Sequence, residues 1–115
     1  MNEGFNYATG IYWTWTSDDN RYKKNAFQEM SLFLDMNNET GLVCCDYDRI
    51  DGEGNLLETI VLSDPQEMIL LNTVGACFLY RSEIAKELGK YKPELFLVED
   101  YEYWLRFFIF SKINV

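Results

Sequence analysis

An apolar segment that ends abruptly at two adjacent carboxylates constrains the fold of this chain more than any other feature. Residues 11–16 are β-branched and aromatic, a pattern that predicts a buried strand. Ser17, Asp18, Asp19 and Asn20 follow directly. Two carboxylates at the end of a buried strand are costly unless a cation or a helix N-terminus compensates their charge. Because ligands of open α/β sheets bind at the carboxyl ends of strands, Asp18 and Asp19 are candidate ligands of a divalent cation that carries a phosphate ester.

The same pattern also describes an ordinary strand-turn-helix junction. Asp and Asn are common turn and N-cap residues. Residues 21–37 then show the i, i+3, i+4, i+7 spacing of an amphipathic helix, so a turn is all that the chain requires here. These residues alone leave both interpretations open.

Composition limits the classes of function that are open to the chain. Its 115 residues suit one domain, and the 48% hydrophobic and 17% aromatic content argues against disorder. A net charge of -9 disfavours a nucleic-acid partner, because no basic stripe is present to neutralise phosphates. An acidic protein can still bind an anionic nucleotide when a cation lies between them.

The chain contains no histidine, which removes imidazole as a general base, as a nucleophile's partner and as a metal ligand. Acid–base chemistry therefore falls to carboxylates, Lys, Tyr or Cys. Cys44 and Cys45 are neighbours and Cys77 is isolated, so no spacing suits tetrahedral zinc. The cysteines are typical of reduced core residues. Since no signal peptide or membrane-spanning run is visible, we expect a cytoplasmic protein.

The rest of the pattern alternates strands and helices, which predicts an α/β fold. The first ten residues suggest a loop or a helix end. The elements expected after the first strand and helix are strands at 42–47, 56–62 and 75–81, a hairpin turn at 51–55, a short helix or loop at 65–71, a helix at 83–88 with Ser82 as N-cap and Gly89 as its stop, and a last helix at 99–109.

Glu99 and Asp100 open that last helix, after the apolar run 96–98. The simpler interpretation is that acidic residues favour the positive end of the helix dipole. A carboxylate at a helix N-terminus beside a cleft is also how a protein without histidine holds a general base. The local sequence does not separate the two.

Several motifs together resemble those of family 2 glycosyltransferases. Residues 15–20 and 94–106 resemble the two signature regions of the family. The stretches 75–81 and 89–94 resemble its acceptor-side strand and the G-x-Y-x-P-E loop that follows. Asn6, Ala8, Gly10 and Tyr12 resemble the stretch that precedes the metal motif. Each motif is weak by itself, but their order agrees with the family over nearly the whole chain.

The resemblance implies a partial GT-A fold, which is the nucleotide-diphospho-sugar transferase fold: a mixed sheet flanked by helices, with a β-hairpin insertion. It implies transfer of a sugar from a nucleotide-sugar donor to an acceptor hydroxyl, by inversion, with Mn²⁺ or Mg²⁺. Members of the family commonly transfer the sugar to saccharide or lipid-linked acceptors in polysaccharide biosynthesis. No residue here indicates peripheral membrane contact.

The same resemblance assigns roles to individual residues. Asp18 and Asp19 correspond to the metal-binding motif, with Asp19 the more direct ligand. Asp100 corresponds to the general base that deprotonates the acceptor. Glu99 corresponds to its neighbour, which shapes the acceptor site. Trp104 and Arg106 would lie near the donor phosphates or brace the helix; the alternative is that Trp104 only packs in the core and Arg106 is only a surface charge.

The resemblance places residues 1–115 in the C-terminal part of the catalytic domain, from the metal motif to the general-base helix. The family's first strand-loop-helix-strand units, which hold the base and ribose, have no counterpart in these residues. We therefore expect open sheet edges that pair with a second copy or a separate N-terminal half, without which the chain would be inactive. The alternative is a non-catalytic truncated domain that serves as an oligomerisation or interaction module.

Overall fold

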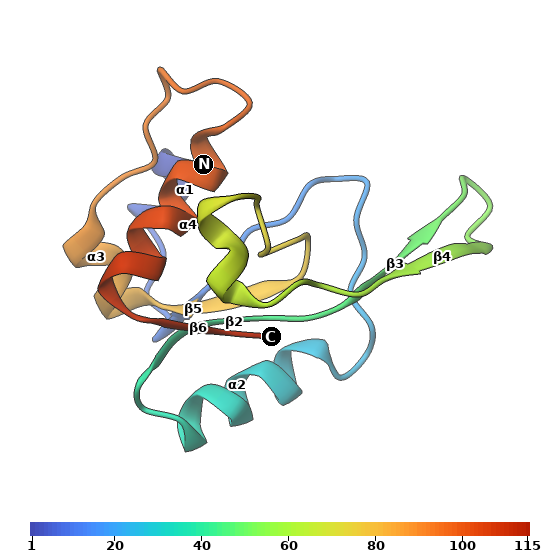
Figure 1. The fold of residues 1–115 in the computed structure, drawn as a ribbon, viewed down its shortest axis with the longest axis horizontal. Coiled ribbons are helices and arrows are strands. Elements are labelled where there is room, and N and C mark those ends of the chain that lie inside the picture. The colour runs from blue at the N-terminus through green and yellow to red at the C-terminus, as the bar shows by residue number, and fades with distance from the viewer.

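A four-stranded mixed sheet organises the computed structural model, which describes residues 1–115 (Figure 1). The elements in chain order are α1 (Asn2–Phe5), β1 (Tyr12–Trp13), α2 (Ala26–Met36), β2 (Thr40–Cys44), β3 (Tyr47–Ile50), β4 (Leu56–Ile60), the 3₁₀ helix η1 (Pro65–Ile69), β5 (Phe78–Arg81), α3 (Ser82–Leu88), α4 (Glu99–Phe110) and β6 (Lys112–Asn114). The strand order is β1-β5-β2-β6. β5 is antiparallel to both its neighbours, and β6 is parallel to β2.

Helices cover both faces of this sheet, and the hairpin β3–β4 extends from one end of it (Figure 1). α2 lies on one face, whereas α3, α4 and η1 lie on the other. The predicted α/β class, with a mixed sheet flanked by helices and a hairpin, is therefore confirmed. None of the helices is long and apolar enough to span a bilayer.

Alternation along the two central strands divides the core into two layers, because successive side chains of a strand point to opposite faces. Leu42 and Tyr80 face the layer that contains α3 and α4. Val43 and Leu79 face α2, where they pack with Met30. All five side chains are at least 95% removed from solvent, so both faces of β2 and β5 are fully covered.

An aromatic cluster fills the layer on the α4 side. Trp104 lies 4.8 Å from Phe78, measured between ring centroids, and Phe78 lies 5.3 Å from Trp15. Both pairs are edge-on, the arrangement that the charge distribution of aromatic rings favours. The cluster also includes Phe5, Trp13, Tyr80, Tyr91, Tyr103 and Phe107. Many of the aromatic side chains of the protein therefore pack together in a single layer.

Two of the predicted elements are shorter than expected, and side-chain contacts explain why. The strand predicted at 11–16 pairs only over β1, because the Thr14 hydroxyl donates to the Phe78 carbonyl (2.7 Å) where a backbone bond would continue the ladder. The helix predicted at 21–37 begins only at Ala26. The preceding residues run along the hairpin, where Lys23 forms a 2.6 Å ion pair with Asp48.

Other boundaries also differ from the sequence prediction. The strand predicted at 42–47 is two strands, since β2 ends at Cys44 and β3 starts a separate hairpin. Ser82 is the first residue of α3 and makes no capping bond, which corrects its predicted role as N-cap. Gly89 does end α3, with a φ of 81° that favours glycine. The edge strand β6 was not predicted at all.

The buried side of α4 supplies the first test. Phe107 is fully buried in the aromatic cluster, whereas Ile109 on the same helix is 84% exposed. We expect Phe107→Ala to lower the free energy of unfolding by about 3–5 kcal/mol, because it removes a large ring and leaves a cavity. Ile109→Ala should change it by about 0.5 kcal/mol or less. Urea unfolding followed by fluorescence measures both, and equal losses would contradict this packing.

Candidate functional site

Asp18 and Asp19 occupy an exposed turn that follows the short edge strand β1. The Asn20 backbone N–H donates to the Ser17 carbonyl (3.3 Å), and the Asn20 side-chain amide donates to the Ser17 hydroxyl (3.3 Å). The sequence placed these carboxylates at the end of a buried strand, and this is wrong. Residues 14–17 leave the sheet first, so both carboxylates reach solvent and their charges need no compensation from the fold.

The donor set limits what this turn can hold. No group of three or more His, Cys, Asp or Glu side chains gathers closely enough to hold a metal ion. Mg²⁺ and Mn²⁺ prefer oxygen ligands, and Mg²⁺ commonly takes one or two carboxylates together with water and phosphate oxygens. Asp18 and Asp19 are therefore too few to hold a resident structural metal, and a cation bound by them would need further oxygen ligands from water or phosphate.

Asp100 lies in the first turn of α4, where two groups donate hydrogen bonds to its carboxylate. Oδ1 accepts a hydrogen bond from the Tyr101 backbone N–H (2.7 Å), and Oδ2 accepts one from the Asn72 side-chain amide (3.4 Å). Asn72 is itself oriented, because its Oδ1 accepts from the Val74 N–H (3.2 Å). The Asp100 carboxylate is therefore partly buried at the N-terminus of a helix. One of its oxygens is hydrogen-bonded to Asn72, which lies in a loop 28 residues earlier in the chain.

Asn72 is a candidate site residue that sequence analysis missed. It lies outside every recognised motif, and only the fold brings it to Asp100. No periodicity or capping pattern in the sequence around Asn72 predicts its hydrogen bond to Asp100. The neighbouring Tyr101 hydroxyl donates to the Met68 carbonyl (2.7 Å), which holds η1 against α4 and so keeps this loop in position.

Glu99 has a different environment from its neighbour. Its Oε2 is buried and has no hydrogen-bond donor within reach. Buried carboxylate oxygens are normally hydrogen-bonded, so this unpaired oxygen is an exception, and because it is buried it has no direct contact with solvent. The start of α4 therefore carries one unpaired, buried carboxylate oxygen on Glu99 and one hydrogen-bonded carboxylate on Asp100.

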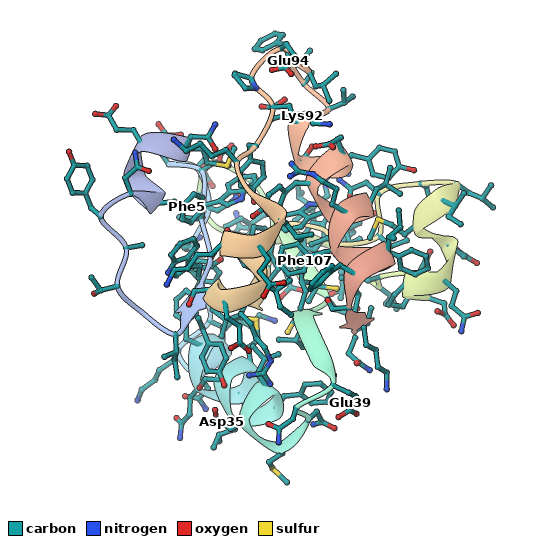
Figure 2. The ribbon with its side chains drawn as sticks, turned by 90° about the vertical axis from the view of Figure 1, so that its left-hand side faces the viewer. Phe5, Asp35, Glu39, Lys92, Glu94 and Phe107 are labelled. Carbon is teal, nitrogen blue, oxygen red and sulfur yellow. The ribbon has the colours of Figure 1, made fainter.

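The loop that leads into α4 projects from the body of the protein. Figure 2 shows Glu94 on the outer part of this loop and Lys92 nearer to the helix. Phe96 and Leu97 are 77% and 79% exposed, and Leu97 has a φ of 70°, in the left-handed region that non-glycine residues rarely adopt. Strained backbone of this kind concentrates at functional sites, and here it lies two residues before Glu99.

The contacts of Trp104 and Arg106 hold α4 in place. Trp104 is 1% exposed within the aromatic cluster. Arg106 donates to the backbone carbonyls of Leu88 (2.5 Å) and Lys90 (2.9 Å), which lie at the end of α3 and just after it. Its guanidinium also lies over the Tyr103 ring, 4.6 Å from the centroid. In the structure Arg106 ties α4 to the end of α3.

The aromatic layer anchors the two acidic segments in common. Trp15 precedes the Asp18 turn, and its indole N–H donates to the Tyr91 hydroxyl (2.9 Å). Tyr91 stacks on Tyr103 of α4, with ring centroids 3.9 Å apart. No hydrogen bond or ion pair joins the turn directly to Asp100. Both segments are therefore positioned through the same rigid set of packed rings.

Comparison with known proteins finds distant relatives that share a general name but no matching family. No protein-family model matches the chain. It is 25% identical over 98% of its length to a protein of Rickettsia prowazekii, 24% identical over 98% to one of Rickettsia typhi, and 23% identical over 99% to one of Rickettsia conorii. Each of the three is named an uncharacterized glycosyltransferase. The alignments cover 39%, 39% and 21% of these relatives, so the chain spans two fifths or less of their length.

Glu102 lies in α4, two residues after Asp100, and its pKa is shifted. Partial burial acts to raise its pKa, but hydrogen bonds and charges from Lys92 and Arg106 outweigh this effect and lower the pKa below its usual 4.5. Its ion pairs with the two cations are both 2.9 Å long. Because the folded-state pKa is depressed, the resulting stability is present above pH 4.5 and is lost as the pH falls through the folded-state pKa.

Replacement of the Glu102 carboxylate tests whether its depressed pKa makes the stability of the protein depend on pH. We expect the melting temperature of the Glu102→Gln variant to fall less steeply than that of the native chain as the pH drops below about 4.5, because the variant has no charge to lose. Glu94→Gln is the control, since Glu94 is exposed and forms no ion pair. Identical pH profiles for the native chain and Glu102→Gln would refute this prediction.

Proposed function

We propose that this chain is the metal- and acceptor-binding part of a family 2 glycosyltransferase with a partial GT-A fold. The observation that carries the proposal is the similarity, over nearly the whole chain, to three proteins named glycosyltransferases. Both acidic segments lie inside that similar region. The mixed sheet with helices on both faces is consistent with such a domain.

In this proposal Asp18 and Asp19 hold Mn²⁺ or Mg²⁺ together with the diphosphate of the nucleotide-sugar donor. Their exposed turn suits a cation that is bound only when phosphate oxygens complete its coordination. When bound, the cation would neutralise the charge that develops on the departing nucleoside diphosphate. An exposed acidic turn also explains how a chain of net charge -9 binds an anionic nucleotide.

Asp100 is the proposed general base. As the acceptor oxygen bonds to the anomeric carbon and the bond from that carbon to the diphosphate breaks, the Asp100 carboxylate takes the proton of the acceptor hydroxyl. The Asn72 amide holds one carboxylate oxygen so that the carboxylate keeps its orientation. In this proposal Glu99, the neighbour of Asp100, shapes the acceptor site, where a saccharide or a lipid-linked sugar would bind.

The base and ribose of the donor would be held by protein outside these residues. β1 is an edge strand of only two residues, so its outer side is open to another strand. A second copy of the chain or a separate N-terminal half would fill this position. The same open edge favours the second candidate function, a non-catalytic module that pairs with a partner through its sheet.

Calorimetric titration of UDP, GDP and dTDP with and without Mn²⁺ separates the two candidates. The proposal predicts that at least one nucleotide binds, and only with Mn²⁺. Asp19→Ala should weaken this binding about tenfold or more, a loss of about 1.4 kcal/mol, because it removes a ligand. Glu53→Ala, in the exposed hairpin turn, is the control and should bind normally. A tight dimer that binds no nucleotide would favour the interaction module.

The general-base assignment makes a separate prediction. Asp100→Asn should reduce release of nucleoside diphosphate from a nucleotide sugar by about 10²–10⁴-fold, because the amide cannot accept the proton. Nucleotide binding should be unchanged. Asn72→Ala should cause a smaller loss, since the carboxylate remains but is held less firmly. The assay is made with the second copy or the N-terminal half that completes the site, and equal, measurable activity of Asp100→Asn and the native chain would rule out this role.

A further inference from the structure

Cys45 and Cys77 lie opposite each other where β2 and β5 begin to separate. The register pairs Cys44 with Phe78, so the next pair along the two antiparallel segments is Cys45 with Cys77. The Cys45 N–H donates to the Cys77 carbonyl (2.9 Å), so the two backbones still lie side by side at this position. Residues directly opposite each other on antiparallel strands have Cα atoms about 4.5–5.5 Å apart. This separation lies within the range of about 4.4–6.8 Å that disulfides span.

The two thiols also share one face of the sheet. Both cysteines pack against the small core cluster beneath α2. Cys44 belongs to the opposite layer, where its thiol lies 3.4 Å from the Asn114 carbonyl. The backbone of the sheet therefore separates Cys44 from the other two thiols, although it is the sequence neighbour of Cys45.

Accessibility and acidity distinguish the three cysteines in the same way. Cys44 is 1% exposed, and burial raises its pKa to about 12. Cys45 and Cys77 are only partly buried, and all three are free thiols. The neighbouring Cys77 thiol, together with partial burial, raises the pKa of Cys45, whereas the neighbouring Cys45 thiol lowers the pKa of Cys77. Cys77 is thus the thiol best suited to react first, as the thiolate is the nucleophile.

We propose that Cys45 and Cys77 form a reversible disulfide by exchange with a low-molecular-weight disulfide such as oxidised glutathione. Cys77 Sγ attacks one glutathione sulfur, which forms a mixed disulfide and releases one glutathione thiolate. Cys45 Sγ then attacks the Cys77 sulfur and releases the second. The two protein thiols are oxidised, the glutathione disulfide is reduced to two thiols, and the two thiol protons leave with the products.

The disulfide would join the end of β2 to the segment just before β5. That segment runs from Asn72 to Cys77 and contains no helix or strand. A covalent link at its end would restrict its motion and raise the melting temperature of the oxidised form, since a cross-link limits the unfolded chain. This modification site does not depend on the proposed transferase activity.

Peptide mapping of the full chain after incubation with oxidised glutathione tests the proposal. We expect a peptide linked through Cys45 and Cys77, with Cys44 unmodified, and its loss on treatment with dithiothreitol. Cys44→Ser, the matched control, should form the same link. Cys45→Ser should accumulate glutathione on Cys77, because the thiol that resolves the mixed disulfide is missing. Cys77→Ser should accumulate less on Cys45.

Three results would overturn the proposal. They are a link that involves Cys44, stable glutathione adducts on the native chain without an internal link, and cross-linked dimers as the main product. Mapping of the native chain does not require any variant to fold. Far-ultraviolet circular dichroism of each serine variant shows whether its result comes from folded protein.

Discussion

The packing of α4 on the sheet is the interaction on which the rest of the structure depends. Trp104 and Phe107 are buried between the helix and the central strands, so loss of this contact would open the larger of the two hydrophobic clusters. The same rings receive Trp15 from the Asp18 turn, through Phe78. Arg106 then fixes the far side of the helix by its bonds to Leu88 and Lys90. A single hydrophobic layer thereby positions both acidic segments.

Much of this layer could be predicted from the sequence, because its signals are local. The β-branched and aromatic runs predicted β2 and β5, the helical spacing predicted α2, and the acidic first turn indicated α4, with errors mainly at their ends. The ends depend on contacts that no local pattern contains. β1 stops where Thr14 turns to the Phe78 carbonyl, and β6 exists only because β2 offers it an edge.

The candidate site was predictable to a lesser degree. Carboxylates after a strand or at a helix start are visible in any sequence, and both pairs lie in accessible or partly buried positions. Their surroundings were not predictable. Asn72 reaches Asp100 from a distant loop, and the unpaired Glu99 oxygen follows from how the loop before α4 is folded. Residues with chemical roles carry a sequence signal, whereas residues that position them acquire theirs from the fold.

The central claim is that Asp18, Asp19 and Asp100 serve one bound donor and acceptor. The most direct test is NMR of the isotope-labelled chain titrated with Mn²⁺ and a nucleoside diphosphate, since the paramagnetic ion broadens signals from nearby amides. The account predicts that residues 17–20 broaden first, and that Asn72 and Asp100 follow. Broadening spread over the acidic surface, or centred on the hairpin turn at 51–55, would contradict it.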